Sequence, residues 1–279
     1  MTAISFTSQF VSWNGGCLFL SSRAHGVTPM HAHYAIQITF GPEPGIRFRA
    51  SDDAPWTAYD GVIIPSRQPH TMDATPVAAS AVLFVEPETR EGRALAERWL
   101  QGGITALPGA LLADVAAPLF AAWRDDGRDA VVTAAAQDVV RALTGRVEPS
   151  VVSDERILRA TAYVRAHLDR ALTLEEVAAE ACLSPSRFRH LFVEQTGMGL
   201  RPYVLWRRFV RVWELIAAGT PLSAAAHAAG FADAAHLSRT SRTMFGFPPS
   251  AAAGVIAARR PPAPDLGAGA AGQPLRSTA

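Results

Sequence analysis

Residues 173–197 read TLEEVAAEACLSPSRFRHLFVEQTG and contain the signals of two short helices joined by a tight turn. Thr173 followed by Glu176 is a capping box, in which the hydroxyl accepts the amide of the third helical residue while the glutamate reaches back. Ser184 and Pro185 are typical of the N-cap and first residue of a second helix. Two helices joined this closely, with polar side chains on the second, indicate a helix-turn-helix.

The second helix of this pair has two different faces, because residues three or four apart share one side of a helix. We expect the apolar set in the core: Phe188, Leu191 and Phe192. We expect the opposite set to face DNA: Ser186, Arg189 and His190. Arg189 is the best candidate for reading bases, since a guanidinium can bond the edge of a guanine twice. The alternative for Arg189 is a phosphate contact or a solvated surface charge.

The same device returns in residues 220–250, TPLSAAAHAAGFADAAHLSRTSRTMFGFPPS. Thr220 and Pro221 predict another N-cap followed by a first-turn proline. Gly230 marks the turn, and Asp233 is placed to cap the last helix. The side chains that we expect to face DNA here are Ala235, His236, Arg239 and Arg242. Among them, His236 and Arg239 are the candidate base readers and Arg242 a phosphate contact.

The two copies and the segment between them resemble the DNA-binding domain of AraC/XylS-type transcription regulators. The resemblance rests on LSPSRFRHLFVEQTG, RPYV, RRFVRVWELI, AAGF, HLSR and FGFPPS, within a domain placed at residues 154–256. It implies a long helix between the copies, here from Arg201 to Ala218. Ser241 departs from the aromatic core residue usual in the family. We expect its hydroxyl to bond a carbonyl one turn earlier, or the second unit to pack more loosely. Ala234 and Ala235 replace the polar base readers of many relatives, which predicts few direct base contacts there.

The N-terminal part has the pattern of a β domain, which we place at residues 1–86. Short apolar or alternating runs occupy 35–40, 46–50, 61–65 and 78–86, with the turn clusters GPEPG, SDDAP and SRQPH between them. Such spacing favours a sandwich or barrel. It also resembles a cupin barrel, the usual N-terminal partner in this regulator family. The predicted fold class is therefore multidomain α+β, with a cupin-like β-barrel and helical segment followed by an all-α domain containing two helix-turn-helix motifs.

Between the two domains the hydrophobic period changes to that of helices. We place a helical segment at residues 87–146, with apolar stripes over 91–100, 111–126 and 129–143. The family resemblance implies a dimerisation role for it. The alternative is that these helices only cover the barrel. Residues 147–153 are predicted as a linker, and residues 257–279, rich in Ala, Gly and Pro, as a disordered tail.

A set of histidines in the β domain predicts a second site. His31, His33 and Gln37 share the same parity in a strand, so they can point to one face and converge with His70 at the barrel mouth. Imidazole ligands favour a divalent transition metal such as Zn, Ni, Cu or Fe. Metal-binding cupins are similar in this spacing. The alternative is a polar pocket that binds an organic effector without metal.

The composition of the chain limits the classes of protein to which it can belong. Apolar residues make up 49% of the chain, yet no run is long enough to span a membrane, and the opening Met1–Ala3 does not begin a signal peptide. Residues 1–152 hold 11 Arg and 15 acidic residues, whereas residues 153–256 hold 12 Arg and 9 acidic residues. The positive balance therefore lies where the helix-turn-helices lie, as DNA binding requires.

These observations predict a cytoplasmic, sequence-specific transcription regulator. Its expected partners are double-stranded DNA, a small-molecule or metal effector and, by the resemblance, RNA polymerase and a second copy of the chain. No catalytic residue is predicted. The rival interpretation is a metal-dependent cupin enzyme, an oxygenase or isomerase, fused to a DNA-binding domain.

Overall fold

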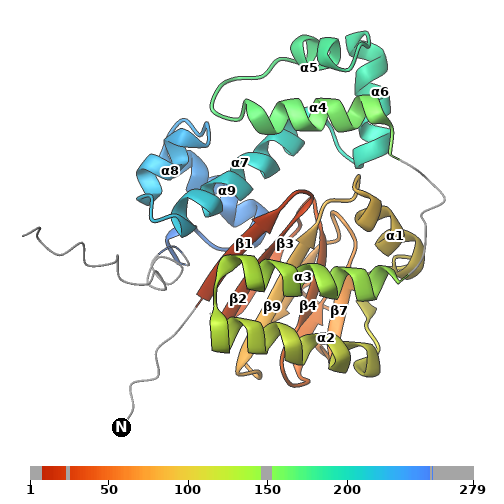
Figure 1. The fold of residues 1–279 in the computed structure, drawn as a ribbon, viewed down its shortest axis with the longest axis vertical. Helices are drawn as coiled ribbons and strands as arrows, with labels where there is room; N and C mark the ends of the chain where they lie inside the picture. Colours follow the sequence, from red (N-terminus) through yellow and green to blue (C-terminus); the bar gives the residue numbers. More distant parts are fainter. Residues whose placement is uncertain (1–7, 23–25, 146–152, 252, 254–279) are drawn as a thin grey trace, which may run out of the picture.

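In its described residues the chain has a β-rich N-terminal half and an all-helical C-terminal half (Figure 1). The computed structural model describes residues 8–22, 26–145, 153–251 and 253. The predicted fold class, an N-terminal β domain with helices and a C-terminal domain with two helix-turn-helices, is confirmed. The predicted tail at 257–279, and all of the predicted linker except Ser153, lie outside the described residues.

The β domain consists of two antiparallel sheets. The six-stranded sheet has the order β1-β2-β9-β4-β7-β10, and the four-stranded sheet the order β3-β8-β5-β6. The strands of the first are β1 (Ser8–Trp13), β2 (Gly16–Ser22), β9 (Ala79–Val85), β4 (Ile36–Phe40), β7 (Gly61–Ile64) and β10 (Thr105–Ala106). Those of the second are β3 (Val27–His31), β8 (His70–Asp73), β5 (Ile46–Arg49) and β6 (Thr57–Tyr59). Four strands, β4, β5, β7 and β9, lie at the predicted positions.

Helices cover one face of the six-stranded sheet (Figure 1). They are α1 (Arg90–Trp99), α2 (Gly109–Ala121) with one π-helical turn, η1 (Ala122–Asp126), and α3 (Asp129–Thr144). Leu112 and Leu119 of α2 and Val139 of α3 share one core with Ile38 and Leu83 of the sheet. The apolar stripes of this segment therefore pack on the sheet, and a dimerisation role stays a prediction.

The C-terminal domain has six helices in its described part. They are α4 (Glu155–Ala166), α5 (Leu174–Glu180), α6 (Pro185–Thr196), α7 (Leu200–Ala217), α8 (Leu222–Ala228) and α9 (Ala234–Phe245). Trp206, Phe209 and Trp213 of α7 are almost fully buried. They share one core with Phe188 of α6 and Leu237 of α9, so the long helix joins both helix-turn-helix units. None of the described helices is long and apolar enough to cross a membrane.

Three predicted helix caps are present. Thr173 Oγ1 accepts the amide of Glu176 at 3.1 Å, and Ser184 Oγ accepts the amide of Arg187 at 3.4 Å. Asp233 Oδ1 accepts the amide of His236 at 2.6 Å. These side chains satisfy amides that a helix leaves without partners in its first turn.

Other local predictions were wrong. Glu176 is an exception, because its carboxylate accepts a backbone hydrogen bond at Thr173, as the capping box predicts, and also forms an ion pair with Arg170. Thr220 does not cap α8, whose N-cap position is Pro221 and has no side-chain hydrogen bond. Ser241 is fully buried, but its hydroxyl donates forward to the carbonyl of Phe247 instead of back along the helix.

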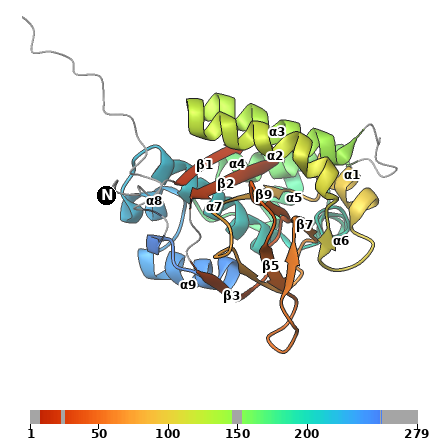
Figure 2. The ribbon, with the colours of Figure 1, turned by 90° about the horizontal axis from the view of Figure 1, so that it is seen from below.

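The two domains share an apolar and polar interface. Phe10 and Phe84 of the sheet belong to the same buried cluster as the α7 tryptophans. Within this interface the Arg207 guanidinium forms a buried ion pair with Glu86, which also accepts the indole N–H of Trp206 at 3.2 Å. Farther along the interface, α9 lies beside β3 (Figure 2). The second helix-turn-helix is therefore packed directly on the β domain.

Candidate DNA-binding surface and effector site

The predicted DNA-facing residues lie on the outer sides of α6 and α9. Ser186, Arg189 and His190 are exposed on α6, while Phe188, Leu191 and Phe192 are buried on its other side. On α9 the side chains of Ala235, Arg239 and Arg242 are exposed, and His236 is partly exposed. Both helices thus present the predicted polar faces to solvent, where a DNA groove can reach them. Their contacts with DNA stay a prediction.

Both turns use one residue in the left-handed region. Cys182 has φ 54° in the first turn, and Gly230 has φ 81° at the equivalent position of the second. The amide of the next residue then bonds a carbonyl five residues earlier, from Leu183 to Ala178 at 2.9 Å and from Phe231 to Ala226 at 3.0 Å. This is the Schellman pattern that ends many helices. The side chain of Cys182 is exposed.

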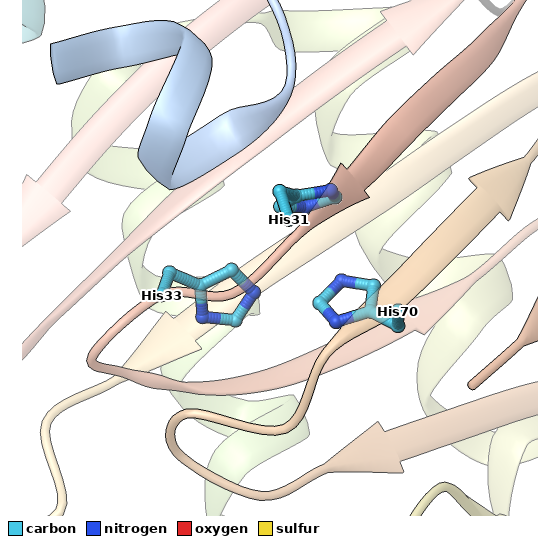
Figure 3. Close-up of side chains that lie close together, drawn as sticks. All are labelled: His31, His33 and His70. Carbon is cyan, nitrogen blue, oxygen red and sulfur yellow. The ribbon is translucent and has the colours of Figure 1, made fainter. Parts of the chain in front are cut away.

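The three histidines come together at the junction of the two sheets. His31 is the last residue of β3 and pairs across the four-stranded sheet with His70, the first residue of β8. His33 lies in the loop that leads into β4. Ring centroids are 4.3 Å apart for His31 and His70, and 5.1 Å for His33 and His70. Figure 3 shows the three rings around one common space, and one ligand atom of each lies within 4.8 Å of the others.

The histidines therefore meet as the sequence predicted, but the argument from strand parity was wrong. Residues 31–37 are not one strand: β3 ends at His31, and β4 begins at Ile36 in the other sheet. The loop between them carries the chain from sheet to sheet and turns His33 toward Gln37.

Hydrogen bonds orient all three imidazoles in the same way. Each Nδ1 lies against a backbone carbonyl: His31 with Pro29 at 2.8 Å, His33 with Ala35 at 2.9 Å, and His70 with Gln68 at 2.9 Å. An Nδ1–H bonded to a carbonyl leaves Nε2 as the lone-pair atom. Metal-binding histidines are held in this manner, because the second bond fixes the tautomer and the ring direction.

The hydrogen bonding of His33 and His70 is incomplete in the space between the three rings. Gln37 Oε1 lies 2.6 Å from His33 Nε2, while its Nε2 donates to Thr39 Oγ1 at 2.8 Å. A neutral ring has one N–H, so His33 cannot donate to both the Ala35 carbonyl and Gln37. A rotated Gln37 amide or a cation bound to Nε2 and Oε1 resolves this conflict. His70 Nε2 is also buried and has no hydrogen-bond partner among the described residues, which favours a bound cation.

Burial keeps these rings neutral. Loss of hydration lowers the pKa of His31, lowers that of His33 well below the usual value, and lowers the pKa of His70 to about 3. The neighbouring rings act in the same direction on His33 and His70. Neutral imidazole is the form that donates a lone pair to a metal. The donor set therefore fits the predicted transition metal.

A cavity of about 200 Å³ opens beside the histidines. His31 and Gln37 contribute its polar wall. Its apolar wall comes from both domains: Phe19, Met72, Val82 and Phe84 of the sheets, and Phe245 and Phe247 at the end of α9. Phe245 also stacks on His33, with centroids 6.2 Å apart and planes inclined by 25°. The part played by α9 was missed from the sequence, where FGFPPS carried only the family resemblance.

A family model described as a helix-turn-helix domain matches residues 177–253, which include both turns and the helix between them. The arabinose operon regulatory protein of Escherichia coli (strain K12) is 32% identical to this chain over 102 residues. This part of the chain is a helix-turn-helix domain that is similar in sequence to the arabinose operon regulator.

The chain is also 33% identical, over 89 residues, to the probable transcriptional regulator LumQ of Photobacterium leiognathi. The two matches cover 35% and 32% of this chain, and 34% and 36% of the respective relatives. The chain thus spans about a third of the length of the curated relatives it matches.

Over most of its length the chain has the fold of ToxT from Vibrio cholerae. A crystal structure of an apo variant from strain SCE256 is 11% identical, with a TM-score of 0.55 over 88% of this chain and 99% of that chain. The wild-type protein of that strain with a bound unsaturated fatty acid is 12% identical, with a TM-score of 0.53 over 88% and 95%. At such identities the likeness shows the two-domain fold alone.

Proposed function

We propose that this protein is a sequence-specific transcription regulator that binds double-stranded DNA. One observation carries the proposal: two helix-turn-helix units share one central helix, α7, and both expose the polar side of their second helix. Units joined in this way can enter successive major grooves about one helical turn, ~34 Å, apart. The two relatives named above are both regulators, which supports the same function for the matched domain.

In this proposal the two units read DNA unequally. Arg189 makes the main base contact, while Ser186 and His190 support it or contact phosphate. Arg239 and His236 read bases from α9, Ala235 allows close approach, and Arg242 bonds phosphate.

Selection from a randomised duplex library tests the proposal with the full chain. We expect one enriched motif of two half-sites separated by about ten base pairs, from the spacing of successive grooves. The control is the Arg189→Ala/Arg239→Ala double variant, which should retain its fold and lose the motif. A wild-type protein that enriches no sequence would overturn the proposed function.

We also propose that the cavity beside the histidines is the effector site, and that His31, His33 and His70 hold a divalent transition metal with Gln37 beside them. The Nδ1–carbonyl bonds and the unpartnered His70 Nε2 support this. The expected metal is Zn, Ni, Cu or Fe.

Metal content after metal-replete expression tests this site. Wild type should carry about one metal per chain, as three oriented imidazoles require, and the His31→Ala/His33→Ala variant close to none. Equal and near-zero content in both would leave a polar pocket for an organic ligand. Thermal unfolding of both proteins controls for a general loss of structure.

A three-histidine site that leaves metal positions open is also the kind used in metal-dependent oxygenases and isomerases. Oxygen uptake by the metal-loaded protein, offered small organic acids and alcohols, tests the oxygenase form of this second candidate. Uptake that disappears in the His31→Ala/His33→Ala variant would favour it over a purely regulatory site.

The remaining proposals rest on the family resemblance: a homodimer in the cytoplasm that contacts RNA polymerase. The exposed sides of α2 and α3 offer a surface for a second copy. Sedimentation of the purified full chain tests the dimer.

A further inference from the structure

The charge of the proposed metal site determines what else must bind there. Three neutral imidazoles and a neutral amide leave a divalent ion with its full double charge. Among the described residues that line the cavity, none is Asp or Glu. Asp73 lies between two lining residues, Met72 and Ala74, and is already paired with Arg47. Since a buried charge without a counter-charge is strongly unfavourable, the ion needs an anionic ligand from outside the chain.

The walls of the cavity determine the rest of that ligand. Apart from His31, Gln37 and a few hydroxyl groups, the lining side chains are apolar. The volume of about 200 Å³ lies below the range of about 300–1,000 Å³ usual for drug-sized ligands. A compact body without further charges fits such a space.

We propose that the site binds a compact apolar anion, such as a small carboxylate or phenolate. Its oxygen coordinates the metal held by His31, His33 and His70, and its apolar body lies between the sheets and α9. The proposal rests on the metal site proposed above and adds the chemical class of the effector.

The position of α9 gives this ligand a route to DNA binding. Phe245 and Phe247 form one wall of the cavity, so an occupant touches both domains at once. Gly246 between them has φ 77°, and a Cβ there would lie 2.9 Å from the carbonyl of Pro29. That carbonyl is the one that orients His31. Ligand occupancy and the position of the second recognition helix are therefore linked, and the ligand stabilises α9 in its docked position.

Calorimetry on the full chain tests the ligand class with zinc as the metal. The zinc titration is done first, with the His31→Ala/His33→Ala variant as control. Cyclohexanecarboxylate is then titrated with and without zinc, against the neutral cyclohexylmethanol of similar shape. We expect zinc to tighten binding of the carboxylate at least tenfold and to leave the alcohol unchanged.

The outcomes separate the two proposals. Zinc bound at the histidines with no zinc-dependent carboxylate binding overturns the ligand class and leaves the metal site standing. Absence of histidine-dependent zinc binding overturns both. A Val82→Trp variant, which fills the cavity, should keep its zinc and lose the carboxylate; Ser80→Leu, on the same wall, serves if the first variant fails to fold. A filled cavity that still binds the carboxylate would place the ligand elsewhere.

Hydrogen exchange tests the link to α9, with α6 as an internal control. Zinc together with cyclohexanecarboxylate should slow amide exchange in residues 234–247 and leave residues 185–196 unchanged. No change in α9, or an equal change in both helices, would overturn the link.

Discussion

The two helix-turn-helix units have the same turn geometry but different surroundings. The first meets the β domain through polar contacts at the end of α6, where Arg93 donates to Gln195 and Arg67 donates to the Gly197 carbonyl. The second packs α9 against β3 and places Phe245 in the effector cavity. The two copies of the motif therefore have different roles. The first projects from the β domain and is free to contact DNA, whereas the second also lines the effector cavity.

The sequences of the two units fit this division. The exposed side of α6 carries Ser186, Arg189 and His190, whereas α9 begins with Ala234 and Ala235. Ser241 stands in the core of the second unit, and α8 lacks a side-chain cap. The second unit therefore has a buried hydroxyl in its core and one helix without a side-chain cap, and we expect its docking on the β domain to contribute more of its stability.

The largest expected effect comes from the ion pair that joins the domains. Arg207 and Glu86 are both buried, so Arg207→Leu leaves a buried carboxylate without its partner. We expect the free energy of unfolding to fall by about 3–5 kcal/mol. Urea unfolding measures it, with Glu86→Leu/Arg207→Leu as the matched control. The double variant should recover most of the loss, because it leaves neither charge unpaired. Equal losses in the two variants would show that packing, not charge, holds the interface.

The second prediction compares the two turns directly. A Cβ on Gly230 would lie 2.1 Å from the Leu168 carbonyl, in a backbone conformation with φ 81°. We expect Gly230→Ala to lower the free energy of unfolding by well over about 1 kcal/mol. Cys182→Gly, at the equivalent position of the first turn, should raise it by up to about 1 kcal/mol, because φ 54° disfavours a side chain. Thermal unfolding of both variants measures whether stability falls in the first and rises in the second. A change in the same direction in both variants would contradict the equivalence of the two turns.

Local signals made most of the helical domain predictable. Caps such as Thr173, Ser184 and Asp233 act within one helical turn of their own positions, so the sequence places them closely. The prediction for Ser241 was wrong because its partner, the Phe247 carbonyl, lies beyond the end of α9 and not in the preceding turn. A local sequence motif shows which groups can form a hydrogen bond, but the tertiary structure determines which bond forms.

The β domain was less predictable because its pairing is non-local. β1 begins with buried Ser8 and Gln9, and β3 reads VTPMH with a bulge between Thr28 and His31, so neither alternates cleanly. The histidines were found by residue type, yet their meeting depends on a crossing between sheets that no local pattern shows. The contribution of Phe245 to the cavity depends on domain packing and has no local signal at all.

The third prediction separates the units by their base contacts. Arg189→Ala should weaken binding to the selected site by about 1–3 kcal/mol, the range for one bidentate pair, while retaining most non-specific binding. Arg239→Ala should have a smaller effect, because α9 is partly committed to the β domain. Titration of each variant against the selected duplex and a scrambled one measures both. A larger loss of affinity in the Arg239 variant than in the Arg189 variant would show that the second unit makes the main base contact.

The smallest effect is expected at Arg242, which we assign to phosphate. Its side chain is exposed in the last turn of α9, where a guanidinium can neutralise one phosphate without reading a base. Arg242→Ala should therefore weaken binding to every duplex alike and reduce the slope of log affinity against log salt by about one. Titrations at several salt concentrations measure the slope on the selected and scrambled duplexes. A loss confined to the selected duplex, with an unchanged slope, would instead make Arg242 a base reader and give the second unit a larger share of recognition.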